Sequence, residues 1–487
     1  MLFNSIDFAF FFPIVFVLYW IVAKNLTLRN VLILFASYIF YGWWDVRFLL
    51  LIILSSFVDF IVGKQIFKNK HNKKSLLGIS LLVNLGFLFY FKYTNFFIES
   101  FVDTFTFIGK KIEISTLNII LPVGISFYTF QTLSYTIDIY RDKLKPTNNW
   151  LAFFSFVSFF PQLVAGPIER ASHLLPQFYK TYKFDYNVVK SGFFLVAFGL
   201  FKKMVIADRA AILVNQVYNN PSEYSGVETI IATILFAFQI YCDFSAYSDI
   251  AIGVARTMGF DLMKNFKSPY FSKSITEFWK RWHISLSTWF RDYVYIPLGG
   301  NKNGKYRTYV NLFIVFVISG LWHGAAITFL IWGVIHGLII VLEKSTNKVR
   351  INLYNRIGLQ KNTASYKLLF SFITFCIVCF AWIFFRANNY NDAVIILSGL
   401  TDNNYIKLFT KDLYKLGLVR NDFVILIVAI FSLLFFEIIN NRKNIEKILS
   451  RQPLFFRWIA YLLIVFILIF YGVYGDSDTS QFIYFQF

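Results

Sequence analysis

The sequence predicts an all-α protein that crosses a membrane many times, and two observations support this fold class. The chain has 487 residues, of which 57% are hydrophobic and only 15% are charged, whereas soluble domains are about 45–50% apolar and about 25% charged. Continuous apolar runs recur along the chain, and roughly 20 helical residues cross the hydrocarbon core of a bilayer. About 11–13 such segments are expected, and their continuity favours helices over the alternating pattern of a membrane β-barrel. The clearest runs are 8–23, 48–62, 76–91, 151–165, 229–241, 368–385, 423–436 and 458–474.

Basic residues orient the predicted spans. The net charge of +20 would suit a nucleic-acid partner, but the lysines and arginines lie between apolar runs, as the positive-inside rule expects. We therefore expect contact with membrane lipids and no nucleic-acid partner, with the N-terminus outside the cytoplasm. One transmembrane domain, 1–487, is predicted, with a cytoplasmic loop at 257–308 and an extracytoplasmic tail at 476–487. The segments predicted to be cytoplasmic are 64–74, 141–149, 256–307, 343–367 and 440–457.

Residues 279–293 of that loop have the pattern of an amphipathic helix. Such a helix places Trp282, His283 and Trp289 on an apolar, aromatic face, with charged side chains opposite. At ~1.5 Å per residue it is roughly 22 Å long, too short and too charged to cross a bilayer. We expect a re-entrant or interfacial helix that turns His283 toward protein or lipid. The alternative for His283 is a buried side chain that merely satisfies a carbonyl.

Six basic side chains between residues 264 and 291 of the same loop would attract a nucleotide-linked donor with several phosphates. No GxxxxGK[ST] or GxGxxG motif occurs in the chain, which argues against an NTPase or a dinucleotide-binding fold. The alternative interpretation is that these residues only fix topology. They are Lys264, Lys267, Lys273, Lys280, Arg281 and Arg291.

The stretch SGLWHGAA interrupts an apolar segment at 309–342, which is long for one span and short for two. Two short helices that meet at this glycine-rich break would hold His323 within the membrane thickness, lining a cavity. Ionisable side chains at that depth are costly and point to function. His336 lies ~20 Å further along a continuous helix and on another face, so we expect no joint metal site.

Three further polar residues interrupt apolar runs. Gln131 lies in FYTFQTLSY, and Asp243 and Asp249 lie in YCDFSAYSD. The spacing of the two aspartates places them on different faces of a helix. Each residue could orient a histidine or satisfy a kinked backbone, and the structural role is the preferred interpretation.

Six motifs occur in order between residues 121 and 386: LPVGISFYTFQTLSYTIDIYR, FFPQLVAGPIER, YCDFSAYSDIAIG, FWKRWHISLSTWFRDYVYIPLGG, SGLWHGAA and AWIFFRA. Together they resemble the membrane-bound O-acyltransferases, and most closely the bacterial membrane subunits that O-acetylate alginate and peptidoglycan. The resemblance implies a ring of about 11–13 helices around a central channel, with short broken helices at the active site. It also implies a multi-pass protein of the bacterial cytoplasmic membrane.

The resemblance assigns roles to residues. His323, in the WHG motif, is the principal catalytic residue, and His283 is the second histidine. An acetyl group would pass from a cytosolic thioester to the outer face, with acetyl-CoA or an acyl carrier protein as donor and no bound cofactor or metal. Chemically, a neutral imidazole suits removal of the hydroxyl proton in such a transfer. The substrate-binding set that we expect is Trp282, Arg281, Arg291, Trp289, Trp322, Asp243 and Gln131.

The end of the sequence, DSDTSQFIYFQF, crowds aromatic residues behind a polar linker. It is similar to a short aromatic motif with a central tyrosine in some family members, where the tyrosine carries the acyl group. That similarity makes Tyr484 a candidate carrier to an extracytoplasmic SGNH-type serine O-acetyltransferase; docking on the membrane surface or a neighbouring helix is the alternative. Two other functions stay open: D-alanyl transfer from a carrier protein, and, in a different class, a transporter or flippase.

Overall fold

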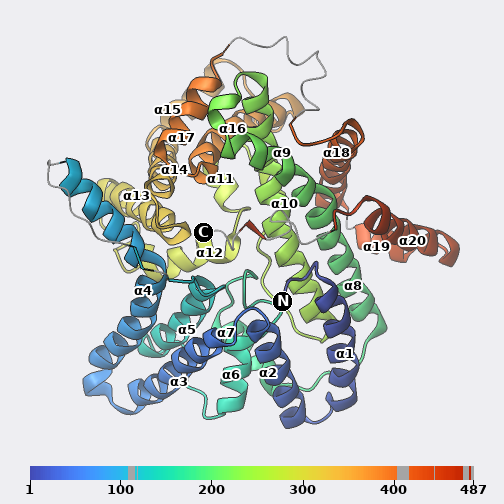
Figure 1. The fold of residues 1–487 in the computed structure, drawn as a ribbon. Coiled ribbons are helices and arrows are strands. Elements are labelled where there is room, and N and C mark those ends of the chain that lie inside the picture. Colours follow the sequence, from blue (N-terminus) through green and yellow to red (C-terminus); the bar gives the residue numbers. More distant parts are fainter. Residues whose placement is uncertain (108–115, 118, 403–415, 444, 475–481, 484–487) are drawn as a thin grey trace. The chain divides into compact units, whose positions relative to one another are not determined.

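The structure is a computed structural model that describes residues 1–107, 116–117, 119–402, 416–443, 445–474 and 482–483 (Figure 1). Over these residues the regular structure is entirely helical, without a strand, which confirms the predicted all-α class. The chain divides into two compact units. Unit 1 comprises Met1–Val196 and Tyr247–Met263, and unit 2 comprises Ala197–Ala246 and Lys264–Phe487.

Seven helices in the described part of the chain are long and apolar enough to cross a membrane. Two others, α1 (Ile6–Val22) and α2 (Leu26–Gly42), are apolar but shorter. This is fewer than the predicted number of about 11–13 segments, and the run at 151–165 shows one reason. Its helix, α6 (Trp150–Ser158), ends after nine residues, because the backbone leaves the helical region at Phe159 and Pro161 follows two residues later.

Unit 1 packs its helices around a buried polar network as well as an apolar core. Asp59 on α3 accepts hydrogen bonds from Ser80 Oγ at 2.6 Å and from Asn84 Nδ2 at 2.9 Å, both on α4. The paired carboxylate ties two candidate spans together without leaving a polar group unsatisfied. The helices of this unit are α1 (Ile6–Val22), α2 (Leu26–Gly42), α3 (Arg47–Lys68), η1 (Lys70–Asn72), α4 (Lys73–Phe107), α5 (Ile125–Tyr140), α6, α7 (Ala171–Leu174), η2 (Leu175–Tyr179), most of α8 (Tyr186–Leu200) and the end of α10 (Val227–Thr257).

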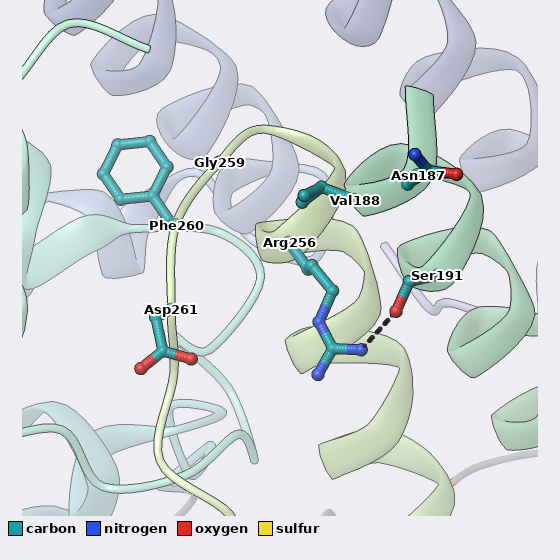
Figure 2. Close-up of a pocket in the computed structure, with 7 residues that line it drawn as sticks. All are labelled: Asn187, Val188, Ser191, Arg256, Gly259, Phe260 and Asp261. Carbon is teal, nitrogen blue, oxygen red and sulfur yellow. Dashed lines mark hydrogen bonds between the residues drawn. The ribbon is translucent and has the colours of Figure 1, made fainter. Parts of the chain in front are cut away.

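A pocket of about 410 Å³ lies in unit 1, between the start of α8 and the end of α10 (Figure 2). Arg256 Nη1 donates a hydrogen bond to Ser191 Oγ across it at 2.8 Å. None of the residues predicted for the reaction site lines this pocket. Its lining residues are Asn187, Val188, Ser191, Arg256, Gly259, Phe260 and Asp261.

Unit 2 holds both predicted catalytic histidines. Near its start lies a wide π-helical turn, η3 (Phe201–Ala207), which continues directly into α9 (Asp208–Asn219). The helices of this unit are η3 (Phe201–Ala207), α9 (Asp208–Asn219), η4 (Pro221–Glu223), the first part of α10, η5 (Pro269–Phe271), α11 (Ile275–Trp279), α12 (Ile284–Phe290), η6 (Arg291–Tyr295), α13 (Gly304–His323), α14 (Ile327–Ser345), α15 (Asn347–Arg356), α16 (Ala364–Arg386), α17 (Tyr390–Gly399), α18 (Arg420–Arg442), α19 (Ile445–Ser450) and α20 (Leu454–Tyr471).

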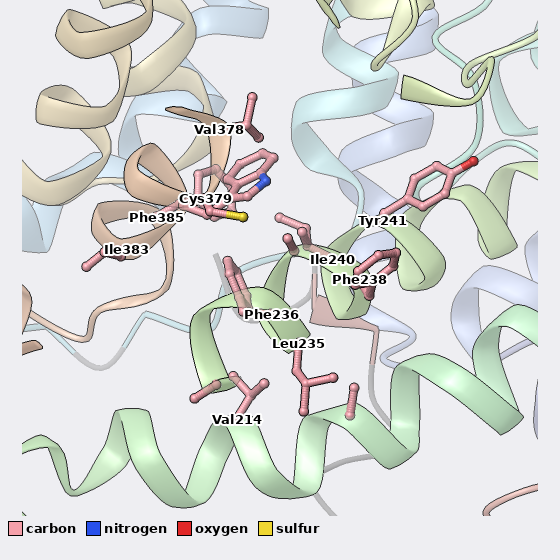
Figure 3. Packing of buried hydrophobic residues seen from close by; sticks show 14 of the residues in the cluster. Val214, Leu235, Phe236, Phe238, Ile240, Tyr241, Val378, Cys379, Ile383 and Phe385 are labelled. Atoms are coloured by element: carbon pink, nitrogen blue, oxygen red, sulfur yellow. The ribbon is translucent and has the colours of Figure 1, made fainter. Parts of the chain in front are cut away.

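The core of unit 2 includes hydrophobic side chains of α9, α10 and α16, and Figure 3 shows aromatic rings from α10 and α16 among them. Trp382 on α16 packs on Trp332 of α14, with ring centroids 5.9 Å apart and an interplanar angle of 16°. Trp282 also packs on Trp382, and their ring centroids are 5.1 Å apart. Large rigid rings of this kind bury much apolar area at little entropic cost. The cluster therefore holds the segments that carry the two histidines against α16.

Candidate active site

Residues around His283 form two short helices joined by a turn, and the single helix predicted for 279–293 is wrong. α11 ends at Trp279, and α12 starts immediately after His283. His283 has a left-handed backbone with φ of 43°, which is uncommon for a residue with a side chain. Helical periodicity assumes a regular backbone and therefore does not indicate this turn. The prediction that His283 faces protein or lipid is confirmed for protein, because the residue is buried in protein at 0% exposure.

Asn265 determines which nitrogen of His283 carries the proton. Its Oδ1 lies 3.1 Å from His283 Nδ1 and accepts hydrogen bonds from the N–H and the Oγ of Ser285. A backbone N–H can only donate, so the Asn265 atom at this position is the oxygen, and Nδ1 of His283 carries the proton. Nε2 is then the basic nitrogen. Burial lowers the pKa of His283 well below its ordinary value, which keeps the ring neutral at physiological pH.

The glycine-rich break at His323 occurs as predicted. α13 ends at His323, and α14 starts at Ile327. The two helices are 20 and 19 residues long, so the expectation that the helices on either side of this break are short is wrong. The reason is that α13 starts at Gly304, inside the segment that was assigned to the cytoplasmic loop. His323 itself is buried, at 4% exposure.

Glycines bring α13 and α14 into backbone contact near the break. A Cβ atom on Gly320 would lie 2.4 Å from the carbonyl oxygen of Phe329, and one on Gly333 would lie 2.5 Å from that of Phe316. Real Cβ atoms do not approach a carbonyl so closely, so larger residues at either position would push the helices apart. The close contact therefore fixes the position of His323 relative to α14.

The two histidines face each other across a short distance inside aromatic walls. Their ring centroids are 6.4 Å apart, and Trp322 contacts both rings at 6.0 and 4.8 Å. Phe244 covers His283 at 4.6 Å, and Trp332 contacts His323 at 5.0 Å. Two imidazoles in one water-poor apolar site can accept a substrate proton and orient the acceptor or donor group.

The other aromatic and basic residues predicted for substrate binding occupy two environments. Trp282, Trp289 and Trp322 are buried, at 1%, 5% and 4% exposure. Arg281 pairs with Glu277 at 2.6 Å, with a side chain 25% exposed. Arg291 pairs with the neighbouring Asp292 and is 58% exposed. Of the two arginines, Arg291 is the more accessible to a ligand.

Asp243 and Gln131 are held by partners other than the two histidines. Asp243 Oδ1 lies 2.7 Å from Lys203 Nζ, in a buried ion pair. Gln131, in unit 1, donates from Nε2 to the carbonyl of Phe156 at 2.8 Å, a contact that fits the structural interpretation. Tyr484 lies outside the described residues, although the two residues before it are described and buried.

Sequence reasoning missed three residues that shape this region. Asn265 and Ser285 hold His283, and Lys203 neutralises Asp243. A signal for Lys203 was available, because Lys202 and Lys203 directly follow the apolar run 193–201. No periodicity marks Asn265, because its position depends on a tertiary contact between two loop segments.

Comparison with known proteins identifies the family. The model of the membrane-bound O-acyltransferase family matches residues 18–388, which is most of the chain. The chain belongs to the membrane-bound O-acyltransferase family. The matched range of this O-acyltransferase includes His283 and His323, and it stops before the segment at 482–483. The predicted enzyme class is confirmed, and the alternative of a transporter or flippase is set aside.

Relatives of this O-acyltransferase act on different envelope polymers. It is 38% identical over 453 residues to the probable alginate O-acetylase AlgI of Pseudomonas syringae pv. tomato, covering 92% of this chain and 84% of the relative. It is 36% identical to the peptidoglycan O-acetyltransferase of Helicobacter pylori, over 84% of this chain and 81% of the relative. It is 28% identical to the teichoic acid D-alanyltransferase of Bacillus subtilis, over 56% and 71%.

We expect His283→Ala to slow acyl transfer strongly, by roughly 10- to 100-fold, while a measurable rate remains. The reason is that His283 is held rigidly by Asn265 and faces His323, so its loss removes orientation and a hydrogen-bond partner and leaves the second imidazole in place. The measurement is the initial rate in membranes that contain equal amounts of each protein. A rate equal to that of the unmodified enzyme would instead identify His283 as a buried, purely structural side chain.

Proposed function

We propose that this O-acyltransferase passes an acetyl group from a cytosolic thioester across the bacterial cytoplasmic membrane for O-acetylation of a cell-envelope polysaccharide, peptidoglycan or an alginate-like polymer. The observation that carries the proposal is the pair of buried histidines with centroids 6.4 Å apart, in a chain whose relatives are named as O-acetylases of such polymers. The proposal includes a passage between the helices that gives access to the two histidines from both faces of the membrane.

The proposed chemistry uses His323 as the general base. Its neutral imidazole removes the proton of the attacking hydroxyl, and the oxygen attacks the thioester carbonyl. The carbon–sulfur bond breaks, and the thiolate takes a proton back from the imidazolium. Nε2 of His283 accepts a hydrogen bond from the donor or the acceptor and orients it. The aromatic walls limit hydrolysis of the thioester, because they exclude water from the site.

The proposed acceptor on the outer face is the hydroxyl of Tyr484. The acetyl group moves from sulfur to the phenolic oxygen, and the aryl ester then donates it to the serine of an extracytoplasmic SGNH-type O-acetyltransferase, which acetylates the polymer. A phenol has a pKa near 10, so it is a better leaving group than an alkyl alcohol. The aryl ester therefore stays reactive enough for the second transfer.

The proposed donor is acetyl-CoA, entering from the cytosol beside the basic segment 264–305. A D-alanyl carrier protein is the second candidate, because of the similarity to teichoic acid D-alanyltransferases. The deciding experiment supplies membranes with [14C]acetyl-CoA or with a D-[14C]alanyl carrier protein and follows label into the chain and the polymer. Label from acetyl-CoA alone supports acetyl transfer, whereas label from the carrier alone overturns it.

We expect charge reversal at Arg291, and at Arg281, to weaken donor binding, and more so at low salt than at high. Dissolved ions already screen the attraction between a guanidinium and the donor phosphates at high salt. Both substitutions place a carboxylate beside an acidic partner, Asp292 or Glu277, and Arg291→Glu is the more direct test because Arg291 is 58% exposed and Arg281 only 25% exposed. The measurement is the apparent KM for the donor at two ionic strengths.

The matched control for this experiment is Arg356→Glu. Arg356 is the last residue of α15, is exposed, and lies in another segment predicted to be cytoplasmic. This substitution changes the net charge equally and should leave the apparent KM unchanged. If Arg291→Glu and Arg281→Glu also leave KM unchanged, the basic residues serve topology only.

A further inference from the structure

Three charged side chains form a buried cluster at the junction of η3, α9 and α10. Lys203 Nζ lies 2.8 Å from Asp208 Oδ1 and 2.7 Å from Asp243 Oδ1. All three side chains are buried, at 1 to 4% exposure. Asp243 lies midway along α10, a candidate membrane span. Charges at such a position are costly and are found where they serve a function.

The cluster holds the chain just before Tyr484. The N–H of Ile483 donates a hydrogen bond to Asp243 Oδ2 at 2.7 Å, and the ring of Phe482 lies with its centroid 4.2 Å from Lys203 Nζ. Figure 1 shows this short red segment against α10. Both residues are buried, at 1% and 3% exposure. A carboxylate that accepts a backbone N–H and a cation on a ring face are among the stronger contacts of their kind.

The chain also contacts the η3–α9 segment where it leaves α20. The carbonyl of Tyr471 accepts from Arg209 Nη2 at 3.0 Å, and the N–H of Val473 donates to the carbonyl of Met204 at 2.9 Å. In the sequence, Met204 directly follows Lys203 and Arg209 directly follows Asp208. The described residues on either side of 475–481 therefore both contact the η3–α9 segment.

The held segment also belongs to the core that surrounds the histidines. Ile483 is part of the hydrophobic cluster that includes Trp332 and Phe385, and the rings of these two residues lie 5.0 and 5.3 Å from the ring of His323. Ile483 and the aromatic side chains that contact His323 are therefore parts of one core.

We propose that Lys203, Asp208 and Asp243 form a clasp that binds the chain at Phe482–Ile483 and so positions Tyr484 for acetyl transfer. Asp243 binds the backbone, Lys203 binds the ring of Phe482 and neutralises Asp243, and Asp208 orients Lys203. These are positioning residues, since none of them touches the reacting atoms. The positioning role rests on the proposed carrier function of Tyr484, whereas the binding of the segment does not.

The test weakens this hydrogen bond from each side in the full-length protein in nanodiscs. Ile483→Pro deletes the N–H donor, and Asp243→Asn deletes the charge of the acceptor. The matched control Ile483→Val keeps the N–H and most of the apolar contact. We expect both test variants, but not the control, to show faster hydrogen–deuterium exchange in the peptide that contains Phe482, and roughly tenfold slower polymer acetylation.

The double variant Asp243→Asn/Ile483→Pro should be no slower in acetylation than the slower single variant, because both remove one interaction. Additive losses, or unchanged exchange in both single variants, would overturn the clasp. His323→Ala serves as the reference for chemistry, and its exchange should equal that of the unmodified protein. Faster exchange in the test variants with full acetylation would show that the clasp binds the segment but would overturn its positioning role, whereas the carrier function is tested separately by Tyr484→Phe.

Discussion

His323→Ala is expected to abolish O-acetylation of the envelope polymer, with a loss of roughly 100- to 10,000-fold in rate, while the protein still accumulates in the membrane. The side chain lies at the end of α13, where glycine contacts fix it against α14. Alanine fits the same backbone but offers no base for the hydroxyl proton. The measurement is the base-labile acetate released from the polymer of cells that produce equal amounts of each protein.

A second buried histidine provides the matched control for His323→Ala. His336 on α14 is 0% exposed and accepts a hydrogen bond from Trp279 Nε1 at 3.3 Å. His336→Ala also removes a buried imidazole, so it should lower stability but leave acetylation well above background. Normal acetylation with His323→Ala would contradict the catalytic role, and equal losses in both variants would indicate that packing alone is affected.

The break at His323 was predictable, because its cause is local. Glycines on both sides of a tryptophan–histidine pair interrupt the apolar pattern, and the helices end and begin there. The same local reasoning gave the all-α class and the burial of His283. It failed at the backbone of His283, whose left-handed conformation accompanies a hydrogen bond to Asn265, 18 residues away.

The charged cluster shows a second limit of sequence reasoning. Asp243 was recognised as a polar residue in an apolar run, and a structural role was preferred for it. Its partner Lys203 lies 40 residues earlier, in a π-helical turn whose wider backbone no sequence pattern indicates. The contact with Ile483 spans 240 residues. Pairings at such separations depend on how whole helices pack, and periodicity carries no information about them.

Tyr484→Phe is expected to abolish polymer acetylation while the segment at 482–483 stays bound. The substitution removes one hydroxyl and keeps the aromatic ring, so apolar docking is retained. The contacts of the preceding residues with Asp243 and Lys203 involve a backbone N–H and another ring, and neither changes. What is lost is the oxygen that would take the acetyl group from the thioester, for which phenylalanine has no substitute.

The matched control is Tyr474→Phe, which removes a phenolic hydroxyl from the same part of the chain. Tyr474 Oη donates a hydrogen bond to the carbonyl of Leu468 at 2.7 Å, so its loss should affect local packing only and leave acetylation intact. In cells that lack the proposed extracytoplasmic transferase, mass spectrometry should find an acetyl group on the peptide containing Tyr484, and neither Tyr484→Phe nor His323→Ala should show it. Full polymer acetylation by Tyr484→Phe would rule out the carrier role, and an acetylated peptide in His323→Ala would place the first transfer on another base.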